Sequence, residues 1–466
     1  MHKRNLGICL AIFLLCGLGA FAQNAQKQTP PAGGPPKPFN LPPATSFTIP
    51  NGLRVTMVPY GTVPKVMVAA VTRAGNLNEA ADQVWLADIT GEMMKEGTKT
   101  RTAEEVAQQA AAMGGAIDIN VGPDQTRVSA DVLSEFGPKM AALLADVVEN
   151  PNLPASELPR LKQDALRKLA IAKTQPQQIA TEEFRRTLYP NHPYGRVFPT
   201  EDMINKYSVD DVQKFYTTNF GAARTHVYVV GRFDAGAMKQ AVTSAFSSWK
   251  KGPDAFMDVP HPTMQRSFSL IDRPGAPQTT LYIGLPTAYP GNPDYIPLIV
   301  MNSLLGGSFG SRITSNIREQ KGYTYSPSSQ LSPRYHDAYW LQVADVTTNV
   351  TGPSLKEIFS EIERLQKEPP TETEMKGIKN YLSGVFVLQN SSRQGIINQL
   401  SFVDLHGLGD DYLRTYVQKI NAVTPQQVSA MAAKYIKPDA MTVVAVGDKQ
   451  KIAAQVAPYQ NVSKTQ

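Results

Sequence analysis

The sequence predicts an α+β fold of two homologous halves, each a mostly antiparallel sheet with helices packed on one side. A helix start and a strand occur twice, since 216 residues separate Ser208 from Thr424 and also Gly231 from Gly447. Each copy has a polar capping segment followed by an apolar strand that ends at glycine. Within each copy, strands come first and helices follow, which favours antiparallel sheets over alternating βαβ units.

The first half covers residues 45–250 and begins with strand signals. Residues 46–59 contain an Asn51-Gly52 turn followed by alternating apolar and polar residues. A capping box at Thr102 marks the start of one helix, and Gly97 ends the helix before it. The other expected strands are 65–72, 116–121, 125–132 and 225–230, and the other expected helices are 80–96, 135–149, from 155, from 208 and 234–250.

The second half covers residues 265–460 and repeats this outline. Thr424 is an expected N-cap with Pro425 at the first helical position. Residues 251–264 are rich in proline and glycine and form the predicted linker between the halves. The expected strands are 266–271, 278–285, 323–330, 337–345 and 441–446, and the expected helices are 293–305, 309–320, 353–366, 371–390, from 424 and after 446.

The N-terminus has the pattern of a secretory signal. A basic start precedes an apolar run from Leu6 to Leu18 and a small-x-small cleavage site at Ala20–Ala22. The alternative, a membrane anchor, is disfavoured because the run is short for a span. We therefore expect a signal peptide over 1–22, a disordered Pro/Gly-rich tether over 23–44, and no stable membrane span in the mature chain.

Composition narrows the class of protein further. Both cysteines, Cys9 and Cys16, lie in the signal, so the mature chain can form neither a disulfide nor a cysteine metal site. Export without disulfides suits a bacterial periplasm or exterior. Removing Lys3 and Arg4 lowers the formal charge from +6 to +4, and the chain has no basic run, so nucleic acid is not an expected partner.

Two segments carry the functional signal. The first is 84–98, VWLADITGEMMKEGT, and the second joins 304–312, LLGGSFGSR, to 317–325, IREQKGYTY. With the duplicated layout, they resemble the insulinase, pitrilysin and mitochondrial processing peptidase family over residues 45–460. Active members of that family carry an inverted His-x-x-Glu-His motif, whose histidines share a zinc and whose glutamate is the general base.

The zinc motif is degenerate in this chain. Aligned on Gly97-Thr98, its positions hold Asp88, Gly91 and Glu92, and Asp164 is the carboxylate nearest to the family's distal glutamate ligand. None of the six histidines has a second one at helical ligand spacing. Asp88 and Glu92 could together hold a magnesium- or calcium-like ion. An ordinary solvent-facing helix is favoured, so we expect no metal in this chain.

In the second segment, Arg318 and Tyr325 match the family pattern in residue type and in spacing. The resemblance implies that Arg318 and Tyr325 bind the substrate backbone and stabilise the oxyanion. A guanidinium and a phenol are suitable donors for that chemistry. The structural alternative is that Arg318 ends a helix and Tyr325 is a strand residue.

The combination predicts a zinc-free subunit of a bacterial heterodimeric metallopeptidase. By this reading the chain is inactive alone, and a homologous zinc-bearing partner supplies zinc and base while Arg318 and Tyr325 complete a site for peptide. Ala116–Asn120 matches the strand edge to which peptide adds in such proteins. The alternatives are a non-enzymatic peptide-binding or scaffold protein, and an active peptidase with an unusual metal site.

Overall fold

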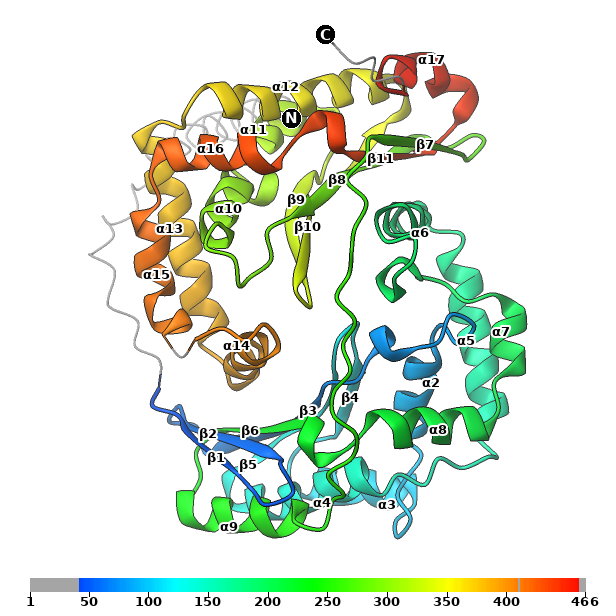
Figure 1. The fold of residues 1–466 in the computed structure, drawn as a ribbon, viewed down its shortest axis with the longest axis vertical. Coiled ribbons are helices and arrows are strands. Elements are labelled where there is room, and N and C mark those ends of the chain that lie inside the picture. Colours follow the sequence, from blue (N-terminus) through cyan, green and yellow to red (C-terminus); the bar gives the residue numbers. More distant parts are fainter. Residues whose placement is uncertain (1–41, 410, 461–466) are drawn as a thin grey trace, which may run out of the picture. The chain divides into compact units, whose positions relative to one another are not determined.

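A computed structural model describes residues 42–409 and 411–460, and it has the α+β fold expected from the sequence (Figure 1). Its two mixed sheets have equivalent strand orders, β1-β2-β6-β3-β5-β4 and β7-β11-β8-β10-β9. The repeated strands β6 and β11 each pair in parallel with one neighbour and antiparallel with the other. This shared topology confirms the predicted duplication.

The first sheet owes its two faces to alternation along each strand. In β2, for example, Val55 and Met57 enter the main core, whereas Thr56 and Val58 point to the opposite face. The strands are β1 (Thr45–Thr48), β2 (Arg54–Pro59), β3 (Lys65–Thr72), β4 (Asp118–Val121), β5 (Thr126–Leu133) and β6 (Thr225–Gly231).

Most helices of the first half lie on the core side of this sheet, whereas the helix Pro176–Leu188 packs on the second sheet. The capping boxes predicted at Thr102 and Ser208 are present, and each hydroxyl accepts from the backbone N–H three residues on. The helices are α2 (Leu86–Met93), α3 (Ala103–Ala112), α4 (Gly137–Glu149), α5 (Leu158–Ala172), α6 (Pro176–Leu188), α7 (Glu201–Lys206), α8 (Val209–Asn219) and α9 (Ala235–Phe246).

The second half repeats the arrangement. Its strands are β7 (Ser267–Asp272), β8 (Gln278–Thr287), β9 (Ser328–Arg334), β10 (Asp337–Thr347) and β11 (Thr442–Gly447). Its helices are α10 (Tyr295–Asn302), α11 (Arg312–Thr314), α12 (Thr351–Lys367), α13 (Glu372–Gln389), α14 (Arg393–Leu405), α15 (Tyr412–Ala422), α16 (Pro425–Tyr435) and α17 (Lys449–Gln460). Thr424 caps α16 with Pro425 at its first turn, as predicted.

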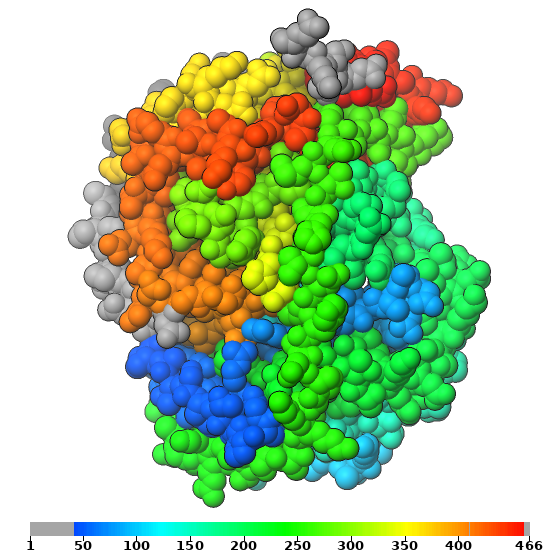
Figure 2. All heavy atoms as spheres, in the orientation of Figure 1, coloured from blue at the N-terminus to red at the C-terminus, as the bar shows by residue number. Residues whose placement is uncertain are grey.

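The two halves exchange helices across their sheets. Ile396 and Ile397 of α14 pack on the second face of the first sheet, against Met67 and Tyr228. In return, Phe184 of α6 and its buried neighbours pack on the second sheet. Figure 2 shows the orange residues around α14 directly against the blue strands β1 and β2. Each sheet is thus covered on its second face by a helix from the other half.

Several expected elements differ from those observed. The helix expected over 80–96 begins only at Leu86, because Trp85 adopts a left-handed conformation with φ of 69°. The helix expected over 309–320 is a three-residue α-turn followed by a π-helix. The strand expected from 323 begins at Ser328, and Thr324 makes only an isolated bridge. The sequence reading did not separate α6 from α5, and it missed α14 and α15.

The remaining segments add two observations. Residues 251–264, the predicted linker, contain neither helix nor strand. Among the described residues, no helix is both long and apolar enough to cross a membrane. The predicted signal peptide, and all but the last three residues of the predicted tether, lie outside the described part of the chain.

Candidate functional site

The degenerate motif lies on α2, where Asp88 and Glu92 already have partners. Asn76 Nδ2 donates to Asp88 Oδ2 at 2.8 Å, and Lys95 Nζ lies 3.0 Å from Glu92 Oε1. Both carboxylates retain some contact with solvent, while burial raises the pKa of Asp88. Each carboxylate thus has a protein partner, and Asp88 still bears a desolvation cost.

Gly91, at the position of the family's general base, is buried between α2 and β4. A Cβ added there would lie 2.6 Å from Cγ2 of Val121. That distance is far below ordinary van der Waals contact, so the Val121 side chain occupies the space that a side chain at position 91 would need. The first half lacks the base, and Val121 would have to move to admit one.

A small cavity of about 80 Å³ brings the predicted positions together. Asp88 and Glu92 of α2 and Asp164 of α5 all line it, as the family alignment implied. Two cations, Arg160 and Lys168, line it as well, and Asp164 forms ion pairs with Arg160 and Arg167. Among residues 42–409 and 411–460, no cluster of three histidine, cysteine or carboxylate side chains is placed to hold a metal.

These residues do not fit zinc. Catalytic zinc sites in proteins use histidine with carboxylate or thiolate ligands and keep one open position. Here the donors are carboxylates alone, and guanidinium and ammonium groups provide the positive charge beside them. We therefore assign no metal chemistry to this half of the chain.

Glu79 is a buried carboxyl beside α2 that the sequence reading missed. Its Oε1 accepts from the backbone N–H of Ala87 at 2.9 Å and from Asn76 Nδ2 at 3.1 Å. Burial, reinforced by the nearby charge of Asp88, raises the pKa of Glu79 to about 8. The group is therefore largely protonated at neutral pH and joins the start of α2 to the preceding loop. A single glutamate in a loop offers no sequence signal for this role.

The glycine-rich segment of the second half forms two π-helical turns. These are η6 (Ser303–Gly307) and η7 (Ser315–Gln320), on either side of α11. A Cβ at Gly306 would lie 2.6 Å from Gln342 Oε1 and from Ser329 Oγ, so glycine is needed for this close packing on β9 and β10. π-Helical turns occur frequently at functional sites.

Arg318, within η7, and Tyr325, beyond its end, lie together at the surface. The Arg318 guanidinium is 4.6 Å from the ring centroid of Tyr325 and 4.6 Å from that of Phe309. Both rings are exposed, Tyr325 to 78% and Phe309 to 65%. Arg318 Nε also lies 3.0 Å from Glu319 Oε1. We call these three side chains, Phe309, Arg318 and Tyr325, the cation–aromatic stack.

One ion pair and one hydrogen bond hold the base of this stack. Arg312 donates to both carboxylate oxygens of Glu374 on α13, at 2.8 and 3.2 Å. Partial burial acts to raise the pKa of Glu374, but hydrogen bonds from Arg312 and Thr371 outweigh it and lower the pKa to about 2. Asn316 of η7 donates to Glu361 of α12 at 2.8 Å. The segment carrying Arg318 is thus fixed to two helices.

Comparison with known proteins agrees with this division. Residues 55–199 match the family described as Insulinase (Peptidase family M16), and residues 206–382 match the family described as Peptidase M16 inactive domain. The chain belongs to the insulinase family of peptidases. The first match contains Asp88, Gly91 and Glu92, and the second contains the cation–aromatic stack.

Relatives in this family are similar over most of their length. The chain is 24% identical over 396 residues to an uncharacterized zinc protease, YmxG, of Bacillus subtilis, covering 84% of this chain and 96% of that protein. It is 25% identical over 320 residues to an uncharacterized zinc protease of Rickettsia bellii, covering 68% of this chain and 77% of that protein. These proteins are named for zinc, whereas the donor set described above does not fit a zinc site.

Solved structures of two bacterial proteins share the fold. A peptidase M16 inactive domain from Pseudomonas fluorescens superposes with a TM-score of 0.81 at 24% identity, covering 87% of this chain and 98% of that one. A protease from Helicobacter pylori superposes with a TM-score of 0.82 at 21% identity, covering 88% of this chain and 100% of that one. The likeness confirms the predicted family fold.

Proposed function

We propose that this chain is the zinc-free subunit of a heterodimeric peptidase and supplies Arg318 and Tyr325 to a composite peptide-hydrolysing site. The partner is a homologous exported subunit that carries the His-x-x-Glu-His motif and its zinc. The predicted signal peptide supports assembly in a bacterial periplasm or outside the cell.

The observation that carries the proposal is the cation–aromatic stack. Stacking between two rings holds the guanidinium of Arg318 in place before substrate arrives. The Tyr325 hydroxyl makes no hydrogen bond with any described residue, so it is free to donate to an acceptor from outside the chain. Arg318 suits a peptide carbonyl and Tyr325 a developing oxyanion.

The edge strand β4 supports a role in peptide binding. Among the described strands β4 pairs only with β5, which leaves its outer edge open to an added strand. It contains most of the segment Ala116–Asn120 that the family resemblance identified. The corresponding edge of the partner subunit would hold the peptide that is cleaved.

Co-expression tests the proposal. The purified chain alone should hydrolyse no quenched-fluorescence peptide, and co-purification with a zinc-bearing relative encoded beside it should restore cleavage. In the complex, Arg318→Ala or Tyr325→Phe should lower turnover by about 100- to 1,000-fold, the usual cost of one oxyanion donor.

A matched control separates the site from general charge effects. Lys367→Ala, on a 74% exposed lysine of α12 that pairs with Glu363, should leave turnover unchanged. Full activity of the Arg318→Ala and Tyr325→Phe double variant would contradict the proposal.

A second candidate is a non-enzymatic peptide-binding or scaffold protein of the same fold. The stack of two exposed rings around a cation would serve equally as a recognition surface. Under this alternative the chain binds peptide or partner, and the complex gains no hydrolysis from Arg318 and Tyr325. The turnover measurement above distinguishes the two.

A further inference from the structure

A large cavity lies between the first sheet and the helix that the second half packs on it. Its volume is about 1020 Å³, at the upper end of the range for small-molecule sites. Strands β1, β2 and β6 form one wall, and α14 with the start of α15 forms the other. The cavity is separate from the zinc-motif positions and from the cation–aromatic stack, none of whose residues line it.

One side of the cavity carries more positive than negative charge. Arg54 binds Asp404 through two contacts, one of them 2.8 Å long, and Arg73 Nη2 lies 3.3 Å from Asp404 Oδ2. A single carboxylate thus faces two guanidinium groups. A third guanidinium, that of Arg414 in α15 beside Leu413, also lines the cavity and makes no ion pair with any described residue.

Donors remain on this side after the internal pairs are counted. Arg54 Nε and Arg73 Nη1 donate no hydrogen bond to the described residues, and Arg73 Nε is buried without an acceptor. The Tyr228 hydroxyl is also buried without a partner, on a residue only 1% exposed. These donors line the cavity and are available to an acceptor that enters it.

His226 does not add to the charge. Its Nε2 lies 2.8 Å from Thr56 Oγ1, and its Nδ1 lies 3.6 Å from Asp404 Oδ1, too far for a hydrogen bond. Burial lowers the pKa of His226, so the imidazole is neutral at neutral pH. The excess charge therefore comes from the arginines.

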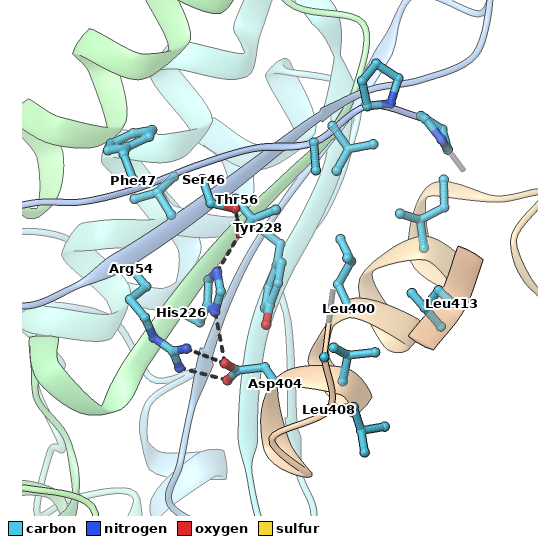
Figure 3. A pocket seen from close by; sticks show the side chains of 18 of the residues that line it. Ser46, Phe47, Arg54, Thr56, His226, Tyr228, Leu400, Asp404, Leu408 and Leu413 are labelled. Atoms are coloured by element: carbon cyan, nitrogen blue, oxygen red, sulfur yellow. Dashed lines mark hydrogen bonds and ion pairs between the residues drawn. The ribbon is translucent and has the colours of Figure 1, made fainter. Parts of the chain in front are cut away.

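The opposite side of the cavity is aliphatic. Figure 3 shows Arg54, His226 and Asp404 gathered on one side and Leu400, Leu408 and Leu413 on the other, with Tyr228 between them. β2 is paired on both sides, with β1 and β6, whereas β1 pairs only with β2 among the described strands. A peptide along the leucine side of the cavity would leave its amides unpaired, whereas a hydrocarbon chain has no polar group to satisfy.

We propose that this cavity binds an aliphatic carboxylate. The carboxylate lies against Arg54, Arg73 and Tyr228, and the hydrocarbon chain lies along Leu400, Leu408 and Leu413. This ligand matches the excess positive charge at one end and the aliphatic wall at the other. The assignment stands whether or not the chain belongs to a peptidase heterodimer.

A fluorescent fatty acid tests the proposal on the full mature chain. Dansylaminoundecanoic acid should show a saturable increase in fluorescence, and decanoate should displace it. Decanol, which has the chain without the charge, and decyltrimethylammonium, which has the opposite charge, should displace it at least tenfold less well. Equal displacement by all three would overturn the proposal, as would the absence of binding.

Variants locate the binding. Leu408→Glu places a negative charge on the aliphatic side, and Arg414→Glu reverses an exposed charge that the fold does not need. Each should weaken probe binding at least tenfold. Leu388→Glu, on a 71% exposed leucine of α13 outside the cavity, should leave it unchanged. Unchanged binding in both cavity variants would overturn the assignment, and so would displacement by a leucine-ended peptide but not by decanoate.

Discussion

At the scale of single residues, Glu79 gives the first half an unusual dependence on pH. Its pKa of about 8 in the folded state lies above the ordinary value of 4.5. Between these values the unfolded chain has lost the proton and the folded chain still holds it, so stability falls as pH rises from about 5 to 8. Glu79→Gln keeps both accepted hydrogen bonds and should remove the share of this decline that Glu79 contributes, on the order of a few kcal/mol. The buried carboxyl of Glu149, whose pKa burial raises to about 7, leaves a smaller decline of its own.

Urea unfolding at several pH values between 5 and 8 measures this effect. Wild type should lose stability across the range, and Glu79→Gln should lose much less. Glu135→Gln is the control, because Glu135 is exposed and makes no hydrogen bond or ion pair among the described residues. Parallel pH profiles for wild type and Glu79→Gln would contradict the assignment.

Gly91 gives a second prediction at this scale. Gly91→Ala places a methyl group 2.6 Å from Val121 and should destabilise the chain by about 1–3 kcal/mol, the usual cost of overpacking. Gly384→Ala, in α13 with open space around its Cβ, should instead be neutral or stabilising by up to about 1 kcal/mol. Denaturation midpoints compare the two. Val121→Ala should rescue Gly91→Ala, and a failure to rescue would show that this contact is not the cause.

At the scale of elements, α14 is held on the first sheet by charged groups at both ends. Arg393 donates to both oxygens of Asp131, and Asp404 pairs with Arg54 and Arg73. Burial acts to raise the pKa of Asp404, but the hydrogen bond from Arg54 and the positive charges of Arg54 and Arg73 outweigh it and hold the pKa below its usual range. Ionised Asp404 therefore stabilises the fold at pH values above its ordinary pKa. This stabilisation is lost as pH falls from that value towards the lowered pKa of the folded state.

Asp404→Asn tests the attachment of α14. The substitution leaves two guanidinium groups without a carboxylate and should cost roughly 1–3 kcal/mol, less than a fully buried pair because the Arg54 side chain is 42% exposed. Urea unfolding measures the loss, and hydrogen exchange of α14 amides should accelerate. Asp254→Asn, in the exposed linker, is the control. Unchanged exchange in α14 would show that the apolar contacts alone hold it.

The sequence predicted elements with strong local signals and missed those that depend on the other half. The capping boxes at Thr102 and Ser208 and the proline-led start at Pro425 are local, and their helices begin where expected. α14 was missed because its buried face consists only of Ile396 and Ile397. These residues pack on a sheet whose strands lie more than 150 residues earlier in the chain. Such a face has little periodicity of its own.

The residues of the candidate site, like the helices, were predicted where a local sequence signal exists and missed where it does not. Arg318 and Tyr325 are seven residues apart in a recognisable segment, and the structure places them in contact. Their neighbour Phe309 was not singled out, because an aromatic in a glycine-rich run is ordinary in sequence. Asp404 and Glu79 act through partners far along the chain or in an irregular loop, and neither lies in a motif.

At the scale of the whole molecule, the duplication relates the two functional segments to each other. A shift of 216 residues carries α6 onto 392–404, nearly the bounds of α14, and carries α5 into α13. The same shift carries α2 onto 302–309, the glycine-rich run. The degenerate metal motif of the first half is thus equivalent in position to the glycine-rich run of the second half, which leads to Arg318. The copies keep one architecture and differ in the chemistry that each offers at the equivalent position.

This division predicts that the fold needs no metal. Asp88, Glu92 and Asp164 already interact with Asn76, Lys95 and two arginines, so EDTA should leave the Tm of the isolated chain unchanged, and added zinc should not raise it. Thermal unfolding with and without chelator, together with elemental analysis, measures both. The combined variant Asp88→His, Glu92→His and Lys168→Glu supplies two imidazoles one helical turn apart and a third ligand, so its Tm should rise with zinc. Stoichiometric zinc in the wild-type chain, or a lower Tm in EDTA, would show that the carboxylates of α2 bind metal after all.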